Sequence, residues 1–177
     1  MNKLYKQQYR IKSARLKGYD YSLPRHYFVT ICTKGKKHYF GKVENWEMHL
    51  SEMGKIAKNF WLEIPGHFPQ AIRDEFVIMP NHIHGVIFIN QRPKYYVETL
   101  QCNVSTCLKN KNMSYISPKY GSVATIIRSY KSITTRTVHE KFPCANFSWQ
   151  SRYYDRIIRN HYELECVRKY IRENPQN

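Results

Sequence analysis

The sequence predicts an α+β fold, a single domain with helices packed on a mostly antiparallel sheet. Its 177 residues are 42% hydrophobic and 15% aromatic, which is enough for one domain with a substantial core. Short β-branched and aromatic runs alternate with longer segments of helical period, in the order β, β, α, β, β, α, β, α. No apolar run approaches the roughly 18 residues of a membrane helix, so the sequence argues against a membrane-spanning protein.

The N-terminal part of the chain predicts a basic arm followed by two strands. Residues 1–24 are polar and basic and form the arm, which leaves residues 25–177 for the folded domain. Residues 27–33 are β-branched and aromatic, a composition that favours a strand. Gly35 lies in a turn, and residues 38–43 are expected to form a short returning strand.

A helix and two further strands are expected in the middle of the chain. Residues 51–64 place their apolar side chains on one helical face, and Pro65 is expected to end that helix. Residues 76–79 and 83–89 are short apolar runs separated by a proline and an asparagine. They are consistent with adjacent buried strands joined by a bend.

The C-terminal part predicts a loop, a helix, a strand and a last helix. Residues 91–120 are polar and form a connection longer than most, typical of a mobile or functional loop. Residues 122–138 have helical apolar spacing, and residues 152–158 are expected to form the last strand. Residues 161–174 are expected to form the last helix, with Pro175 closing it.

The charge of the chain points to a nucleic-acid partner. The net charge is +16, and residues 1–42 hold eleven Lys and Arg against a single acidic residue. Both basic ends of the chain are also rich in tyrosine, so cations for phosphates accompany aromatic faces for unpaired bases. The alternatives are solubility with ordinary core tyrosines, and the weaker possibility of an anionic membrane surface. The expected DNA contacts are Lys12, Arg15, Lys17, Arg128, Lys131 and Arg152.

The five cysteines do not form a recognisable disulfide or zinc framework. They stand at positions 32, 102, 107, 144 and 166, without a Cys-x-x-Cys pair. Cys102 and Cys107 could bind zinc but are more consistent with loop thiols, and the N-terminus lacks the apolar stretch of a secretory signal. These features favour a cytoplasmic protein.

The densest chemical signal is the pair His82 and His84 on either side of Ile83. Successive strand residues point to opposite faces, so both imidazoles would project from one face while Ile83 enters the core. Two imidazoles so placed can share a metal ion. The alternative is a pair of half-exposed strand histidines, but the surrounding strand is apolar and buried imidazoles need partners.

The last helix offers the residues that could complete such a site. Tyr170 and Asn174 are four residues apart and therefore lie one turn apart on one stripe. If that stripe faces the histidine strand, the amide oxygen of Asn174 can be a third ligand beside a free Tyr170 hydroxyl. Alternatively, Tyr170 is a packed aromatic and Asn174 only precedes a helix-ending proline. The neighbouring core stripe consists of Leu164, Val167 and Ile171.

These residues resemble a known family. The His-hydrophobic-His strand preceded by Met-Pro-Asn, with a C-terminal Tyr-Ile-x-x-Asn-Pro helix, resembles the single-tyrosine HUH (IS200-like) transposases. The chain is most similar to the REP-associated tyrosine transposases, a branch of that family. The similarity extends over residues 15–22, 27–33, 121–132 and 149–158.

The resemblance implies a fold, a site and a reaction. Residues 25–177 would be the HUH domain with a ferredoxin-like sheet, Tyr170 the nucleophile, and His82, His84 and Asn174 the ligands of Mg²⁺ or Mn²⁺. The enzyme would cleave and rejoin single-stranded DNA beside hairpins, either REP-like or at the ends of an element, through a 5′-phosphotyrosine intermediate. It would be a bacterial, nucleoid-associated, cytoplasmic monomer or homodimer.

Other interpretations remain open from the sequence. Tyr130 could compete as nucleophile, because neighbouring Lys131 would lower its pKa, as could the tyrosines at 153 and 154. The chain could also be a non-catalytic hairpin-binding protein that keeps the HUH fold, or a small zinc-binding regulatory domain. The short connection between residues 158 and 161 favours a Tyr170 that acts within its own chain.

Overall fold

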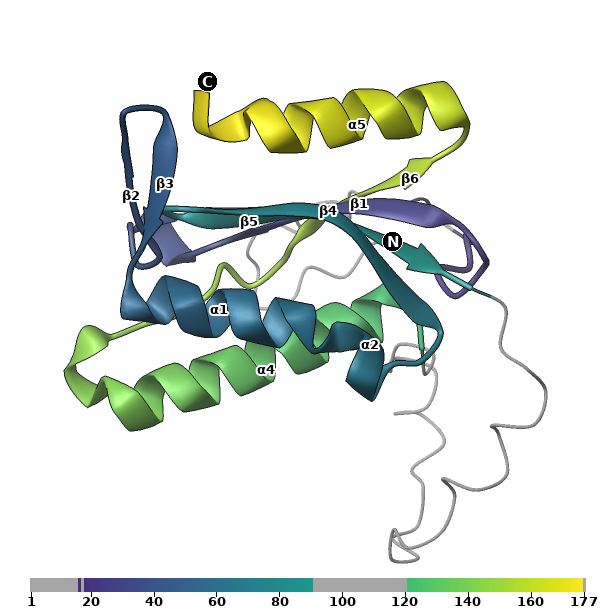
Figure 1. Ribbon diagram of the computed structural model, residues 1–177. Coiled ribbons are helices and arrows are strands. Elements are labelled where there is room, and N and C mark those ends of the chain that lie inside the picture. Colours follow the sequence, from purple (N-terminus) through teal and green to yellow (C-terminus); the bar gives the residue numbers. More distant parts are fainter. Residues whose placement is uncertain (1–15, 17, 91–120, 177) are drawn as a thin grey trace, which may run out of the picture.

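A four-stranded antiparallel sheet lies between two layers of helices. The computed structural model describes residue 16, residues 18–90 and residues 121–176. One helix covers one face of the sheet, and three helices cover the other face (Figure 1). The sheet has the order β4-β5-β1-β6, with β1 (His26–Cys32), β4 (Ala71–Met79), β5 (His82–Ile89) and β6 (Tyr154–Ile158). The predicted α+β fold with an antiparallel sheet is confirmed.

The helices divide unequally between the two faces. Among the described residues, α5 (His161–Glu173) is the one helix on the upper face in Figure 1. The lower face carries α1 (Glu52–Leu62), α2 (Ile64–His67) and α4 (Val123–Lys141). None of the helices in the described part of the chain is long and apolar enough to cross a membrane.

Strand alternation builds a separate core on each face. On β1, the odd-numbered residues from Tyr27 to Ile31 are fully buried and join the larger core with Trp61 of α1. The other face forms a smaller core under α5, whose members are Val86, Ile158, Leu164, Val167 and Ile171. The expected apolar stripe of the last helix therefore rests on the sheet.

A glycine in β5 gives Trp61 its place in the larger core. A Cβ atom at Gly85 would overlap the indole ring of Trp61. Since Gly85 follows His84 directly, its lack of a side chain lets α1 approach the strand that carries the histidines. The strand that carries the histidines on one face of the sheet is thus tightly packed against Trp61 of α1 on the other face.

A two-stranded hairpin stands at one end of the sheet. It consists of β2 (Gly41–Glu44) and β3 (Glu47–Leu50), with Asn45 and Trp46 as its turn. The hairpin rises on the side of the sheet that carries α5, next to the C-terminal end of that helix (Figure 1). Residues of β3 also contact the short 3-10 turn η5 (Asn174–Gln176) that follows α5.

Some predicted elements needed correction. The expected returning strand at 38–43 is wrong: β2 begins at Gly41 and pairs with β3, because the backbone N–H of Phe40 bonds to Pro80 instead. Pro65 does not end helical structure, because it lies in the first turn of α2, where proline is tolerated.

The remaining differences concern the ends of elements. The strand expected at 76–79 begins at Ala71 and contains an irregularity between Arg73 and Phe76. The helix expected at 122–138 continues to Lys141, and the last helix ends at Glu173, so that Asn174 opens η5. The loop 91–120 and most of the arm 1–24 lie outside the described residues, and the division of the chain at residue 24 stays a prediction.

Candidate active site

His82 and His84 lie on the sheet face that α5 covers. Their ring centroids are 4.6 Å apart, while Ile83 between them is fully buried on the opposite face. In the sheet His84 is paired with Thr30 of β1 and Val77 of β4, so it lies inside the sheet rather than at an edge. The strand spacing thus places both imidazoles on one face, as the sequence predicts.

Burial keeps both imidazoles neutral. Desolvation, with a smaller contribution from neighbouring His82, lowers the pKa of His84 to about 4. Desolvation also lowers the pKa of His82, and the charge of Lys36 adds to this effect. At neutral pH each ring therefore has one nitrogen with a free lone pair, the form that binds a metal ion.

The side chains of Asn81 and Thr30 contact the imidazole rings of His82 and His84 and hold their orientation. The Asn81 side-chain oxygen lies 2.6 Å from Nδ1 of His82, and its amide group donates to the carbonyl oxygen of Lys36 at 3.3 Å. Since an amide oxygen only accepts, Nδ1 of His82 carries the proton and Nε2 is free. Thr30 Oγ1 lies 2.8 Å from Nδ1 of His84 and holds the second ring, but a hydroxyl both donates and accepts, so this contact alone does not fix the tautomer of His84.

Tyr170 lies directly beside this pair. Its hydroxyl oxygen is 3.2 Å from Nε2 of His84, and its ring packs edge-on against His84 and Phe28. The side chain is 44% exposed and belongs to the last turn of α5. The helix face that carries Tyr170 is therefore turned to the histidine strand, and the contact forms within one chain.

Asn174 follows one turn later and is buried, at 7% exposure. Its backbone N–H caps α5 by donating to the carbonyl oxygen of Ile171. Its amide as a metal ligand stays a prediction. Within the described residues, no three side chains of the His, Cys, Asp and Glu types gather as a metal site.

The two imidazoles could hold a divalent cation, and with the predicted amide oxygen of Asn174 they would form a mixed N/O set. Two neutral imidazoles with outer partners present free nitrogens from one face, and mixed N/O sets suit Mn²⁺ at least as well as Mg²⁺. A zinc site built on cysteine finds no support: free Cys32, Cys144 and Cys166 do not join the histidines in a cluster of three. Cys102 and Cys107 lie outside the described residues.

An ion-pair network fastens α5 to the edge strand β4. The guanidinium of Arg168 bonds to both carboxylate oxygens of Asp74, at 3.0 and 2.6 Å, and also to Glu165 at 2.6 Å. Arg172 bonds to Glu75 at 2.9 Å. Burial alone would raise the pKa of Asp74, but the hydrogen bonds from Arg168 and from the backbone N–H of Glu75, with the charges of Arg168 and His26, together outweigh that effect and lower the pKa. Because Arg168 stands two residues before Tyr170, this network fixes the helix where the tyrosine meets His84.

We expect the substitution Asp74→Asn to lower the free energy of unfolding by about 1–3 kcal/mol, since it breaks a half-buried, charge-assisted pair. Because the folded state lowers the pKa of Asp74, its stabilisation is present above the ordinary carboxyl pKa and is lost as the pH falls through the folded value. In urea denaturation, the free energies of unfolding of wild type and Asp74→Asn should therefore differ at neutral pH and become similar at acidic pH. The control is Glu140→Gln, which removes the same charge from an exposed pair on α4 and should cost less than about 0.5 kcal/mol. An equal loss in both variants would contradict the role of Asp74.

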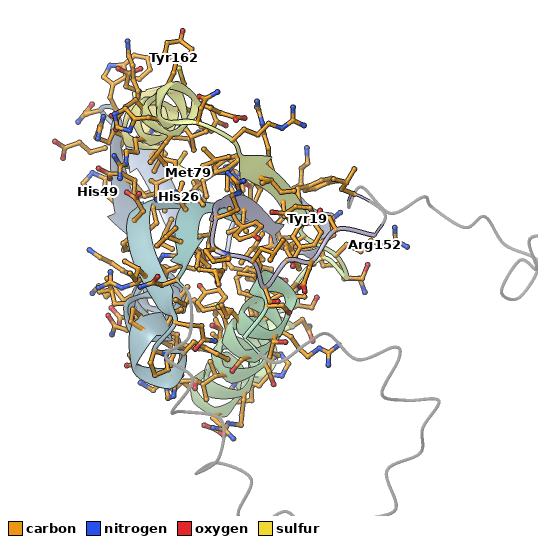
Figure 2. All side chains as sticks on the ribbon, turned by 90° about the vertical axis from the view of Figure 1, so that its right-hand side faces the viewer. Tyr19, His26, His49, Met79, Arg152 and Tyr162 are labelled. Atoms are coloured by element: carbon orange, nitrogen blue, oxygen red, sulfur yellow. The ribbon has the colours of Figure 1, made fainter. Side chains whose placement is uncertain are left out.

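A groove of about 830 Å³ runs from Tyr170 between α5 and β6. It combines aromatic and basic side chains, and Tyr162 points from α5 toward solvent at its outer end (Figure 2). Arg156 in its wall pairs with Glu163, while Arg159 is exposed. Its wall also includes Phe28, Cys166 and Val167. Its size and composition suit a strand of unpaired nucleotides.

The predicted DNA contacts do not gather at Tyr170. Arg128 and Lys131 belong to α4, on the opposite face of the sheet, where they line a second groove of about 630 Å³. The ammonium group of Lys131 donates to the carbonyl oxygen of Gln150, and burial lowers its pKa. Arg152 is exposed and lies away from α5 (Figure 2). The remaining predicted contacts, Lys12, Arg15 and Lys17, lie outside the described residues.

The competing tyrosines are placed differently. Tyr130 is buried, its hydroxyl donates to the carbonyl oxygen of Ala57, and burial raises its pKa. The expectation that Lys131 lowers the pKa of Tyr130 is therefore wrong, and Tyr130 is a core residue. Tyr154 is exposed on β6, two strands away from His84.

The sequence analysis did not assign the outer partners Asn81 and Thr30. Asn81 directly precedes the histidines, and its position next to His82 was the feature of the sequence that could have identified it as a partner. Thr30 meets His84 only through the register of β1 on β5, which no local pattern reveals.

The site combines two histidines on one face of an antiparallel sheet with a tyrosine on the helix that covers that face. Residues 113–174, which include Tyr170 and Asn174, match the family described as "Transposase IS200 like". An uncharacterized protein of Haemophilus influenzae is 36% identical over 167 residues, covering 93% of this chain and 87% of that protein. The part of the chain that carries Tyr170 and Asn174 therefore matches the IS200-like transposase family.

A solved structure shares the fold. The structure of a REP-associated tyrosine transposase bound to a REP hairpin matches with a TM-score of 0.59 at 14% identity. The match covers 94% of this chain and 73% of the other. At this level of identity the likeness concerns the fold.

Proposed function

We propose that this protein is a metal-dependent endonuclease and strand transferase that acts on single-stranded DNA beside hairpins. Tyr170 is the proposed nucleophile. The observation that carries the proposal is the 3.2 Å contact between the Tyr170 hydroxyl and Nε2 of His84, on a neutral histidine pair of the same chain.

The proposed reaction is a transesterification. The phenol oxygen of Tyr170 forms a bond to the scissile phosphorus, and the bond from phosphorus to the 3′ oxygen breaks. The phenol proton is lost, the leaving oxygen gains a proton, and the products are a 5′-phosphotyrosine bond and a free 3′-OH. Because the phosphoester is retained in the covalent link, a second 3′-OH can reverse the step without ATP.

The histidine pair and Asn174 are the proposed holders of Mg²⁺ or Mn²⁺. The bound ion would supply Lewis-acid stabilisation of the charge that develops on the phosphate oxygens. The lone pair on Nε2 of His84 serves one partner at a time, either the Tyr170 hydroxyl or a metal ion. Asn81 keeps His82 in the tautomer that leaves Nε2 free, and Thr30 holds the ring of His84 in place.

Three observations support DNA as the substrate. The net charge of +16 favours a polyanion, and the groove that ends at Tyr170 offers both aromatic and basic side chains. The solved relative with the same fold was bound to a REP hairpin. A hairpin with a single-stranded flank is therefore the substrate class that we propose for this chain.

The polarity of the covalent link tests the proposal. A pool of hairpin oligonucleotides with randomised single-stranded flanks, labelled at either the 5′ or the 3′ end, is incubated with Mg²⁺, Mn²⁺ or EDTA. We expect the 3′ label on denatured protein, the 5′ label on a shortened oligonucleotide, and neither product in EDTA. An adduct that carries the 5′ label, or cleavage without any adduct, contradicts the mechanism. Hairpin binding without cleavage in either metal would favour a non-catalytic binding protein.

A further inference from the structure

The turn of the β2–β3 hairpin exposes a tryptophan. Trp46 is 69% exposed, whereas Trp61 is fully buried and Trp149 is 9% exposed. Trp46 stands at the tip of the hairpin rather than among the apolar residues that line either core. Nothing in the two cores requires an indole ring at this position.

The backbone of this turn is unfavourable for tryptophan. Asn45 and Trp46 have φ angles of 50° and 65°, the left-handed conformation at both central positions of a two-residue hairpin turn. Turns of this kind prefer asparagine followed by glycine, and a bulky residue in this region of φ is uncommon. Asn45 follows that preference, but Trp46 stands where glycine would be more stable. Strain of this type is typical of positions retained for function.

The hairpin places Trp46 on the side of the sheet where Tyr170 lies. The tip rises beside the C-terminal end of α5 (Figure 1), and Tyr170 belongs to the last turn of that helix. Residues of β3 contact η5, which begins at Asn174. An occupant that extends beyond the C-terminal end of α5 would therefore pass the hairpin.

The charged residues beside Trp46 favour contact with a base over contact with a phosphate. Glu44 and Glu47 flank the turn, and only Glu44 pairs with a lysine in the described structure, Lys42. Carboxylates repel the phosphates of a nucleic acid strand, while the indole face attracts the bases. The tip is thus suited to a nucleobase and not to the sugar-phosphate backbone.

We propose that Trp46 is a stacking platform for an unpaired base of the DNA strand held at Tyr170. The identity of the strand rests on the proposed function, but the stacking contact does not require cleavage. Stacking on one aromatic side chain is worth about a tenfold change in affinity, and it tolerates different bases. Trp46 would in this way add affinity beyond the groove between α5 and β6.

The substitution Trp46→Gly separates this role from a structural one. If Trp46 stabilised the fold, its loss would lower the midpoint of thermal unfolding, whereas a stacking role predicts a higher midpoint and a weaker affinity for DNA. Relief of the turn strain should raise the midpoint of thermal unfolding by about 2–4 °C. Affinity for a single-stranded oligothymidylate, measured by fluorescence anisotropy in EDTA, should fall about tenfold. Trp46→Phe keeps an aromatic face, so its affinity for the oligonucleotide should lie between those of wild type and Trp46→Gly. Leu62→Ala, at an exposed apolar position on α1, is the control and should leave the affinity unchanged.

A base-free probe completes the test. An abasic polymer of the same length keeps the phosphates, so wild type and Trp46→Gly should bind it equally. If Trp46→Gly bound both the oligothymidylate and the abasic polymer equally more weakly than wild type, or bound both as tightly as wild type, the proposal would be overturned. A shift from dimer to monomer in Trp46→Gly, with unchanged DNA affinity, would instead assign the tip to a second copy of the chain. Because these measurements use EDTA, they remain informative even where no cleavage is found.

Discussion

The substitution Tyr170→Phe is expected to abolish cleavage and the covalent adduct, while DNA affinity should stay within about twofold of wild type. The phenol oxygen is the only atom lost, and it is the atom that would bond to phosphorus. The ring keeps its edge-on packing against Phe28 and His84, so α5 stays in place. The substitution removes the contact between the Tyr170 hydroxyl and Nε2 of buried His84.

Adduct formation on denaturing gels and binding by anisotropy check this expectation in parallel. Tyr154→Phe is the matched control, because Tyr154 is also exposed and borders the same sheet face two strands away. It should keep full cleavage. An adduct that persists in Tyr170→Phe and disappears in Tyr154→Phe would move the nucleophile to β6.

The substitution His84→Ala should lower the cleavage rate by about a thousandfold, since Lewis-acid stabilisation of the phosphate is worth several kcal/mol. Additional Mn²⁺ should not restore the rate, because one of two imidazole donors is gone. Asn81→Ala should behave differently. It leaves both donors in place but removes the partner that orients His82, so metal affinity should fall about 10–100-fold and high Mn²⁺ should restore the rate.

Metal titrations of the single-turnover rate distinguish the two variants. Circular dichroism and thermal unfolding control for folding, because His84 is buried and its loss deprives Thr30 of a partner. If His84→Ala were rescued by metal as readily as Asn81→Ala, His84 would be an orienting residue and not a ligand.

The sequence predicts the parts of the site that follow local periodicity. A period of two places His82 and His84 on one face, and helical spacing puts Tyr170 and Asn174 on one stripe of the last helix. These features need no knowledge of the tertiary structure, because they depend only on which face of an element is apolar.

The contacts that cross the fold could not be predicted in this way. Asp74 and Arg168 are 94 residues apart and meet at an irregularity of β4. The β2–β3 hairpin was missed because its turn lacks the glycine that marks such turns. Arg128 and Lys131 were placed correctly on a helix, but amphipathic spacing does not say which side of a sheet a helix will cover.

The alternation on β5 has a consequence for folding fidelity. A shift of this strand by one residue would push both imidazoles into the apolar space under Trp61 and turn Ile83 and Gly85 toward α5. Two buried, unpaired imidazoles and a clash or void at the indole would make that misfolded pairing unstable. The two histidines thus disfavour a shifted pairing of β5, and substituting both of them is expected to weaken the choice of register as well as the proposed metal site.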